Sequence, residues 1–409
     1  MNVIERFRRL TPVQRHTFTA CFLGWSLDAF DFFILIFCVS AIASEFHTQV
    51  VVVAKAIFYT LALRPVGAFL FGMMADRFGR RPTLMVNIIA FSVLEFASAF
   101  APSLTAFLVL RALFGIAMGG EWGVGAALTF ETLPKEGRGF FSGLLQEGYV
   151  VGYLLAAILY GTLFTHVGWR GMFMIGALPA LLVIHIRSNV EESPAWLRGQ
   201  DAKERTEAVL KGIFVHIGTF LFLVVLMFGF NSLSHGTQDL YPTFLEKNRG
   251  FSPGTIGLVA IVYNVGALLG GIVFGTLSER AGRKRAIVFA ALCTIPMIPL
   301  WAFSHSAHML AIGGFLMQFM VQGAWGVVPA HLNELSPPSV RATFPGCAYQ
   351  LGNLLASKNA VLQASIAEKH CGGQYAPVLA WTVVIVAILV AITTLAGREA
   401  SGSDLSATR

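Results

Sequence analysis

Charged residues are scarce in this sequence of 409 residues. Asp, Glu, Lys and Arg together make up 12% of the chain, whereas about 25% is usual for a soluble globular protein. Hydrophobic residues make up 56%. This composition excludes a soluble globule. The net charge of +7 is explained by short basic loops between membrane spans, and we expect no nucleic-acid partner.

Cysteine is also rare, and its spacing is irregular. The five cysteines show no paired spacing, so we expect no disulfide framework. The sequence has no His/Cys cluster at metal-ligand spacing, no nucleotide-binding glycine loop and no soluble catalytic domain. These absences argue against an enzyme and against a bound metal or other cofactor.

Apolar runs of about 20 residues, by contrast, recur along the whole chain, and each is long enough to cross a hydrocarbon core of about 30 Å. We predict an all-α polytopic membrane protein whose Lys and Arg residues follow spans 2, 4, 6 and 8, which places both termini in the cytoplasm. The twelve predicted spans are 17–41, 51–74, 83–101, 104–130, 140–164, 168–187, 213–235, 255–277, 286–303, 308–331, 343–366 and 376–397.

The two halves of the sequence repeat at a constant offset. The motif Gly72-x-x-x-Asp76-Arg77-x-Gly79-Arg80-Arg81 recurs 203 residues later as Gly275-x-x-x-Glu279-Arg280-x-Gly282-Arg283-Lys284. Glu131 and Arg138 recur at the same offset as Glu334 and Arg341, and Trp122-Gly123-Val124 recurs as Trp325-Gly326-Val327. We therefore predict equivalent six-helix bundles at 1–187 and 213–409, joined by a cytoplasmic linker at 188–212.

The charged loop motif, together with Arg111-x-x-x-Gly115-x-x-x-Gly119 in span 4, resembles the best-known motifs of the major facilitator superfamily. The resemblance implies two pseudo-symmetric bundles and transport by alternating access. It also implies that the loop charges form a gating network, in which Asp76 would accept hydrogen bonds from a helix N-terminus and Arg77 would pair with Glu131 or another carboxylate. The alternative is that the arginines only set topology. The gating candidates are Gly72, Asp76, Arg77, Gly79, Arg80, Glu131, Arg138, Glu279, Arg280, Glu334 and Arg341.

A polar stretch at 231–243 continues the apolar run of span 7. On a helix Asn231, His235 and Gln238 lie on one face, and Asp239 shares it, so this face should meet a wet cavity or another helix. Polar contacts that only hold helices together are the simpler alternative. The pattern N-x-x-S-H-x-T-Q-D-x-x-x-T resembles the signature of Jen-type lactate permeases in the sialate:proton symporter family. The resemblance implies proton symport of small monocarboxylates such as lactate or pyruvate. Symport of sialic acid or of another organic acid is the alternative.

Ionisable side chains within the predicted spans are the remaining candidates, because each is costly in lipid unless it is paired or faces water. A carboxylate substrate needs a cation or several hydrogen-bond donors, and coupling needs a group that gains and loses a proton. For substrate binding we list Arg64, Arg111, Lys358, Asn231, His235, Thr237 and Gln238, and for proton coupling Asp28, Asp31, Glu121, His235 and Asp239. Arg111 could instead be a structural cation that pairs with Glu121 or Asp28.

The site is expected where the repeats meet, since Asp28 and Asp31 correspond to Asn231 and Ser234 by the offset of 203 residues. The short loops and the absence of any N-x-S/T sequon favour a bacterial inner membrane. The expected partners are a small carboxylate, a proton and the lipid bilayer. We expect a monomer.

Overall fold

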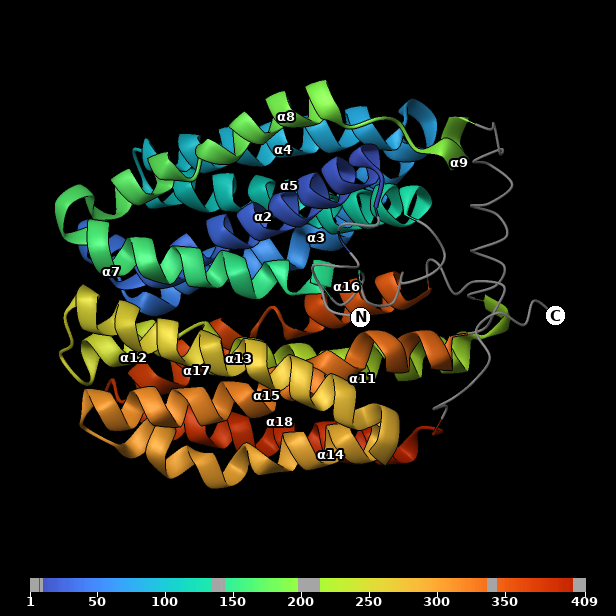
Figure 1. Ribbon diagram of the computed structural model, residues 1–409. Helices are drawn as coiled ribbons and strands as arrows, with labels where there is room; N and C mark the ends of the chain where they lie inside the picture. The colour runs from blue at the N-terminus through green and yellow to red at the C-terminus, as the bar shows by residue number, and fades with distance from the viewer. Residues whose placement is uncertain are drawn as a thin grey trace. The chain divides into compact units, whose positions relative to one another are not determined.

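The computed structural model describes most of the chain, and all regular structure in its described part is helical (Figure 1). The described residues are 7, 10–133, 141, 144–197, 214–336 and 344–399.

The first half of the chain contains long apolar helices joined by short connections. They are α2 (Pro12–Glu45), α3 (Val50–Phe78), α4 (Arg80–Ala99), α5 (Leu104–Thr132) and α7 (Gly148–Ile175), followed by the shorter η1 (Leu178–Leu181), α8 (Leu182–Asn189) and α9 (Pro194–Leu197). Ser103 begins α5 as its N-cap, because its side chain accepts a hydrogen bond from the N–H of Ala106 at 3.2 Å.

The second half follows a similar plan. Its elements are α11 (Ile217–Gln238), α12 (Tyr241–Lys247), α13 (Pro253–Ala281), α14 (Arg283–Cys293), η2 (Ile295–Met297), η3 (Pro299–Phe303), α15 (Ala307–Leu335), α16 (Phe344–Ala356), α17 (Asn359–His370) and α18 (Ala376–Ala396). Ser252 caps α13 in the way that Ser103 caps α5, and Pro253 occupies the first helical position, where its missing N–H costs nothing.

Ten helices in the described part are long and apolar enough to cross a membrane. The protein is therefore an all-α polytopic membrane protein, as the apolar runs predicted. The other two predicted spans, 168–187 and 343–366, are present as interrupted helices.

Local backbone chemistry explains both interruptions. At Gly168 the chain has φ 63° and ψ −177°, a conformation that favours glycine, and this kink separates the predicted spans 5 and 6 within α7. The sixth predicted span then continues through η1, where Pro179 interrupts the α-helical hydrogen bonds, into α8. The eleventh span divides into α16 and α17 at a turn that contains Lys358.

The chain folds as two compact units. The first comprises 1–41, 59–156 and 163–202, and the second comprises 42–58, 157–162 and 203–409. The sequence repeat has a counterpart in helix packing within the units. Gly67 of α3 lies against the backbone of Ile116 in α5, and Gly270 of α13 lies against the backbone of Phe319 in α15. Each glycine permits a close helix crossing that a side chain would prevent.

Candidate functional site

Within the first unit, six charged side chains of the described residues are fully buried. Asp28 and Asp31 lie on α2, and the other four lie on α3, α4 and α5. The six residues are Asp28, Asp31, Arg64, Glu95, Arg111 and Glu121, and we call them the first-unit charge cluster. It contains four carboxyl groups and two guanidinium groups, so carboxyl groups are in excess.

Arg111 is held tightly in this cluster. Its Nη1 lies 2.7 Å from Oε2 of Glu95, and its Nη2 donates to Oγ of Ser98 at 2.7 Å. The guanidinium carbon also lies 4.3 Å from the centroid of the Phe114 ring, a cation–π contact. The sequence suggested Glu121 or Asp28 as the partner of a structural Arg111. That suggestion was wrong, because the ion pair is with Glu95, which lies closer on the neighbouring helix.

The carboxyl groups of Asp28, Asp31 and Glu121 accept no hydrogen bond from the residues that the structure describes. Two glycines make room for them. A Cβ on Gly24 would lie 2.5 Å from Oε1 of Glu121, and one on Gly176 would lie 3.0 Å from Oδ1 of Asp31. The carboxyl groups of Glu121 and Asp31 are thus packed closely, and none of the three has a donor among the described residues, which is costly if all of them are ionised.

Arg64 is the second cation of the cluster. It is 1% exposed, and its Nε and Nη2 have no hydrogen-bond partner in the described part of the chain. Its charge acts on Asp28 and Glu121, and its guanidinium carbon lies 5.8 Å from the ring centroid of Trp25. Arg64 therefore retains donors that a ligand could use, whereas Arg111 is engaged with Glu95 and Ser98.

In the second unit the predicted polar stripe is helical and buried. α11 extends to Gln238, and Asp239 is its C-cap. Nδ1 of His235 lies 3.1 Å from Oδ1 of Asp239, one turn along the helix, and Nε2 of His235 lies 3.2 Å from Oδ1 of Asn353 on α16. The amide of Asn231 donates to its own helix, at the carbonyl of Met227. His235 thus connects the carboxyl group of Asp239, at the end of α11, to the side-chain amide of Asn353 on α16.

Gln318 of α15 connects two further stripe residues. Its Nε2 donates to Oγ1 of Thr237 at 3.1 Å, and its Oε1 accepts from Nε2 of Gln238 at 2.9 Å. One turn further along α15, Gln322 donates to Oγ of Ser234 at 3.4 Å. The stripe therefore meets another polar helix face, and the arrangement presents several neutral donors and acceptors.

Lys358 lies apart from this stripe. It occupies the turn between α16 and α17, where it is exposed. An interruption within a predicted span exposes backbone groups that need a polar environment. Lys358 thus remains a candidate cation, but the described contacts do not join it to His235 or to Gln238.

The charged loop motif of the first unit forms a compact network. Arg80 donates through Nε and Nη2 to both carboxylate oxygens of Glu131, at 3.2 and 3.3 Å. Glu192 accepts hydrogen bonds from the backbone N–H groups of Arg80 and Arg81 at the start of α4, where the helix dipole is positive. Gly79, with φ 102°, makes the turn before this helix.

The second unit repeats this network. Arg283 donates to Glu334 through Nε and Nη2. Glu399 accepts from the N–H groups of Arg283 and Lys284. Gly282, with φ 90°, makes the corresponding turn. Gly282, Arg283 and Glu334 match Gly79, Arg80 and Glu131 at the offset of 203, so the repeat seen in the sequence extends to side-chain contacts.

The structure corrects one predicted pairing of the loop. Arg77 is exposed and lies over the ring of Phe78 at 5.2 Å, and the partner of Glu131 is Arg80. Arg80 begins α4, from where it reaches α5 across the helix contact, whereas Arg77 is in the last turn of α3. Arg280 is exposed in the same way.

Some gating candidates cannot be placed. Arg138 and Arg341 lie outside the described residues, and so do the side chains of Asp76 and Glu279. A Cβ on Gly72 would meet no atom within 4 Å, so no close packing requires a glycine there.

Several residues of these arrangements were missed by the sequence reasoning. Gln318 and Gln322 recur at i and i+4 in a predicted span, and this spacing is the signal that could have found them. Glu192 and Glu399 follow the last predicted span of each half, at positions that the constant offset does not align. For Asn353, neither a regular spacing nor the repeat offset indicated a role.

Repeated helical halves with buried charges and a buried polar helix face define a membrane transporter of the major facilitator type. The fold agrees: the inward-open structure of the xylose transporter XylE from E. coli superposes with a TM-score of 0.75 over 95% of this chain and 97% of that one, at 18% identity. The chain belongs to the sugar (and other) transporter family, whose model matches residues 17–216 and 214–400.

Two curated relatives are similar over most of this chain. A carboxylic acid transporter protein homolog from Saccharomyces cerevisiae is 29% identical over 90% of this chain, which spans 64% of that protein's length. The sialic acid transporter NanX from Escherichia coli is 28% identical over 97% of this chain and 96% of its own length. The family and these relatives are transporters.

Proposed function

We propose that this protein is a proton-coupled symporter of small monocarboxylates such as lactate and pyruvate, working by alternating access in a bacterial inner membrane with both termini in the cytoplasm. The observation that carries the proposal is the excess of buried carboxyl groups over guanidinium groups in the first-unit charge cluster. The carboxyl groups of Asp28, Asp31 and Glu121 lack hydrogen-bond donors among the described residues.

Because of this excess, the free energy of the cluster depends on how many of its carboxyl groups carry a proton. Arg111 compensates Glu95, which leaves one guanidinium group, that of Arg64, for three carboxyl groups. An uncompensated buried charge is expensive, and a proton on a carboxyl group removes it. A proton that binds here and is released in another conformation would couple its movement to that of a substrate.

Arg64 supplies the positive charge for a carboxylate substrate in this proposal. Its Nε and Nη2, which have no partner among the described residues, fit a planar carboxylate. Binding an anion next to Arg64 weakens the compensation of Asp28 and Glu121, which favours uptake of a proton by one of them. Substrate and proton would therefore bind together, because the proton cancels the negative charge that the substrate brings into the site.

The stripe on α11 supplies the neutral donors and acceptors for the hydroxyl or keto oxygen of the ligand. Thr237, Gln238 and Gln318 form one hydrogen-bonded group. His235 and Asp239 form another, and they can hold a proton between them. Lys358, exposed at the turn between α16 and α17, is the second candidate cation.

The charged loop networks have a different task. Arg80 with Glu131, and Arg283 with Glu334, hold helix ends together within their units. We assign them to the gating of the transport cycle, where they change the populations of conformations and do not bind substrate.

Symport of sialic acid or another organic acid is the second candidate. The similarity to NanX over 97% of this chain supports it. The similarity to the yeast carboxylic acid transporter homolog supports organic acids in general. A larger or doubly charged acid would use Lys358 in addition to Arg64.

Counterflow in proteoliposomes tests the substrate class. Vesicles loaded with unlabelled lactate should accumulate external radiolabelled lactate transiently, and pyruvate should compete better than sialic acid, succinate or benzoate. Stronger competition by sialic acid would favour the second candidate, and the absence of counterflow with every acid would contradict organic-acid transport.

A further inference from the structure

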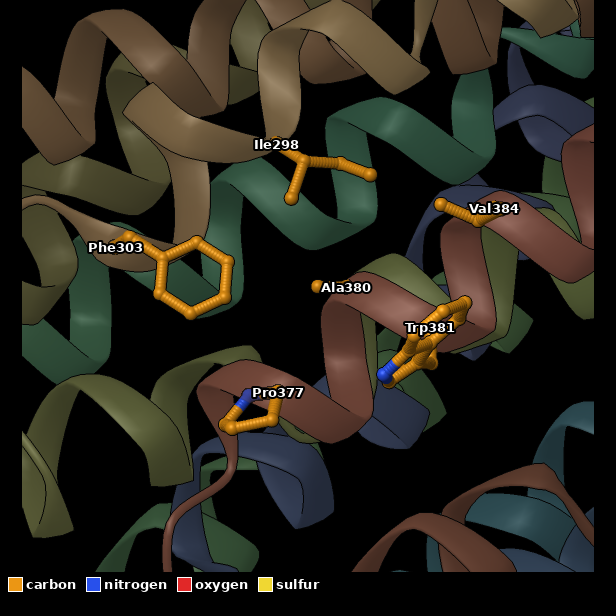
Figure 2. Close-up of a pocket in the computed structure, with 6 residues that line it drawn as sticks. All are labelled: Ile298, Phe303, Pro377, Ala380, Trp381 and Val384. Carbon is orange, nitrogen blue, oxygen red and sulfur yellow. The ribbon is translucent and has the colours of Figure 1, made fainter.

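A cavity of about 300 Å³ lies on the second unit between η3 and the first turns of α18 (Figure 2). This volume is at the lower end of the range of small-molecule sites, about 300–1,000 Å³. All its lining residues are apolar, namely Ile298, Phe303, Pro377, Ala380, Trp381 and Val384. Phe303 and Trp381 are 48% and 67% exposed, so the cavity is an open groove on the protein surface.

The sequence explains why a groove forms here. Pro299 begins the π-helical η3, which interrupts the regular helix that follows Arg283. On the facing side, α18 begins with Pro377 in its first turn and presents the small side chain of Ala380. A distorted helix beside a small residue leaves space that neither helix fills.

The bilayer determines what can fill this space. α18 is a candidate membrane span, and its exposed face continues beyond the groove with Ile385 and Ile392, which are 62% and 60% exposed. In a membrane such a face meets hydrocarbon, because water finds no hydrogen-bond partner there. A groove in this face therefore has the shape and polarity to take an acyl chain.

A cation is fixed beside one end of the groove. Arg249 donates from Nε to the carbonyl of Ser304 and from Nη2 to the carbonyl of Ala302, each at 2.8 Å, so its guanidinium group lies next to the backbone of Phe303. Among the described residues no carboxylate forms an ion pair with Arg249. Burial lowers the pKa of this guanidinium, because it disfavours the charged form.

We propose that the groove is a specific site for one anionic phospholipid, with an acyl chain along Phe303, Ala380 and Trp381 and the headgroup phosphate at Arg249. A phosphate would supply a counter-charge for Arg249, which none of the described carboxylates provides. Trp381 resembles the tryptophans that lie at the membrane–water interface, where one edge of the indole is apolar and the other is wet. This site is separate from the transport groups of α11, so it does not depend on the proposed substrate.

Native mass spectrometry of the full chain, with phosphatidylglycerol and phosphatidylcholine of identical acyl chains, tests the proposal. One phosphatidylglycerol should be retained in preference to phosphatidylcholine. Arg249→Gln should reduce this preference about fivefold, the worth of one basic residue near an anionic lipid. Ala380→Trp, which fills the groove, should abolish retention of both lipids.

Two control variants change exposed positions near the groove. Lys247→Gln removes an exposed charge from the neighbouring α12, and Ile392→Trp places a tryptophan on the exposed face of α18 about two turns beyond the groove. Both controls should retain the lipid as the unchanged chain does. Equal retention of the two lipids, or retention unaffected by Ala380→Trp, would overturn the proposal. So would stabilisation by inorganic phosphate equal to that by phosphatidylglycerol, since it would show a site for a free anion.

Discussion

Nη1 of Arg111 lies 2.7 Å from Oε2 of Glu95, and both side chains are fully buried among the helices of the first unit. This pair uses one of the two cations of the charge cluster. What remains is Arg64 with three carboxyl groups, and the proposed coupling of proton and substrate depends on this remainder.

Removing one partner of the pair should destabilise the protein strongly. Glu95→Gln leaves the Arg111 guanidinium buried without a counter-charge, which typically costs about 3–5 kcal/mol. Thermal unfolding in detergent, followed by intrinsic tryptophan fluorescence, measures this loss. The double variant Glu95→Gln/Arg111→Met should recover part of it, because neither charge then remains. A melting temperature unchanged by Glu95→Gln would contradict the structural role of the pair.

Gly24 should be essential for the position of Glu121. An added Cβ would lie 2.5 Å from Oε1 of that carboxyl group, so Gly24→Ala should cost about 1–3 kcal/mol of stability and lower transport. Gly123→Ala is the matched control, because a Cβ there meets nothing within 4 Å and both changes raise helix propensity equally. Thermal unfolding and lactate uptake of the two variants make the comparison. Equal melting temperatures and equal uptake rates for the two variants would contradict the close packing of Glu121 against Gly24.

Gln318 should matter more than Gln322 for substrate affinity. Gln318 orients Thr237 and Gln238 through two hydrogen bonds, whereas Gln322 makes one longer bond to Ser234. Leaving buried polar groups unpaired costs about 1–3 kcal/mol. Gln318→Leu should therefore raise the KM for lactate about tenfold, and Gln322→Leu should raise it less. Initial uptake rates across a range of lactate concentrations give both values. A larger effect from Gln322→Leu would argue against a ligand role for the Thr237–Gln238–Gln318 group.

The loop network should affect turnover more than binding. Arg80→Gln removes the donors to Glu131 and should lower kcat while leaving KM within about twofold, since these residues shift conformational populations. Arg77→Gln is the control at a neighbouring, exposed arginine. Arg283→Gln and Arg280→Gln form the equivalent pair in the second unit. Initial lactate uptake in proteoliposomes gives kcat and KM for each variant. If Arg80→Gln had the same effect as Arg77→Gln, and Arg283→Gln the same effect as Arg280→Gln, only the positive charge of these loops would matter.

The sequence predicted the fold class and the repeat, because bilayer thickness fixes the length of apolar runs and a constant offset of 203 residues exposes equivalent motifs. It also predicted that Asn231, His235 and Gln238 share a buried helix face. It could not predict that Arg111 pairs with Glu95, since Asp28 and Glu121, which also lie in predicted spans, were chemically equivalent candidates. Side-chain partners on other helices, such as Asn353, depend on helix rotation, which periodicity in one helix does not determine.

The same limit explains the loop. The motif residues Arg77, Arg80 and Arg81 are close in sequence, and charge alone does not say which of them reaches Glu131. The start of α4 after Gly79 decides it, because it directs Arg80 towards α5. Sequence patterns thus identified the charged groups, but which of them pair depends on where each helix begins.

The most direct test of the proposed coupling is proton movement driven by substrate. Proteoliposomes containing a trapped pH dye, held at zero membrane potential, receive an inward lactate gradient without an imposed pH gradient. We predict acidification of the lumen by the unchanged protein, and loss of this acidification with retained lactate counterflow in at least one of Asp28→Asn, Asp31→Asn, Glu121→Gln and Asp239→Asn. Lactate counterflow by the unchanged protein without any acidification would contradict the account.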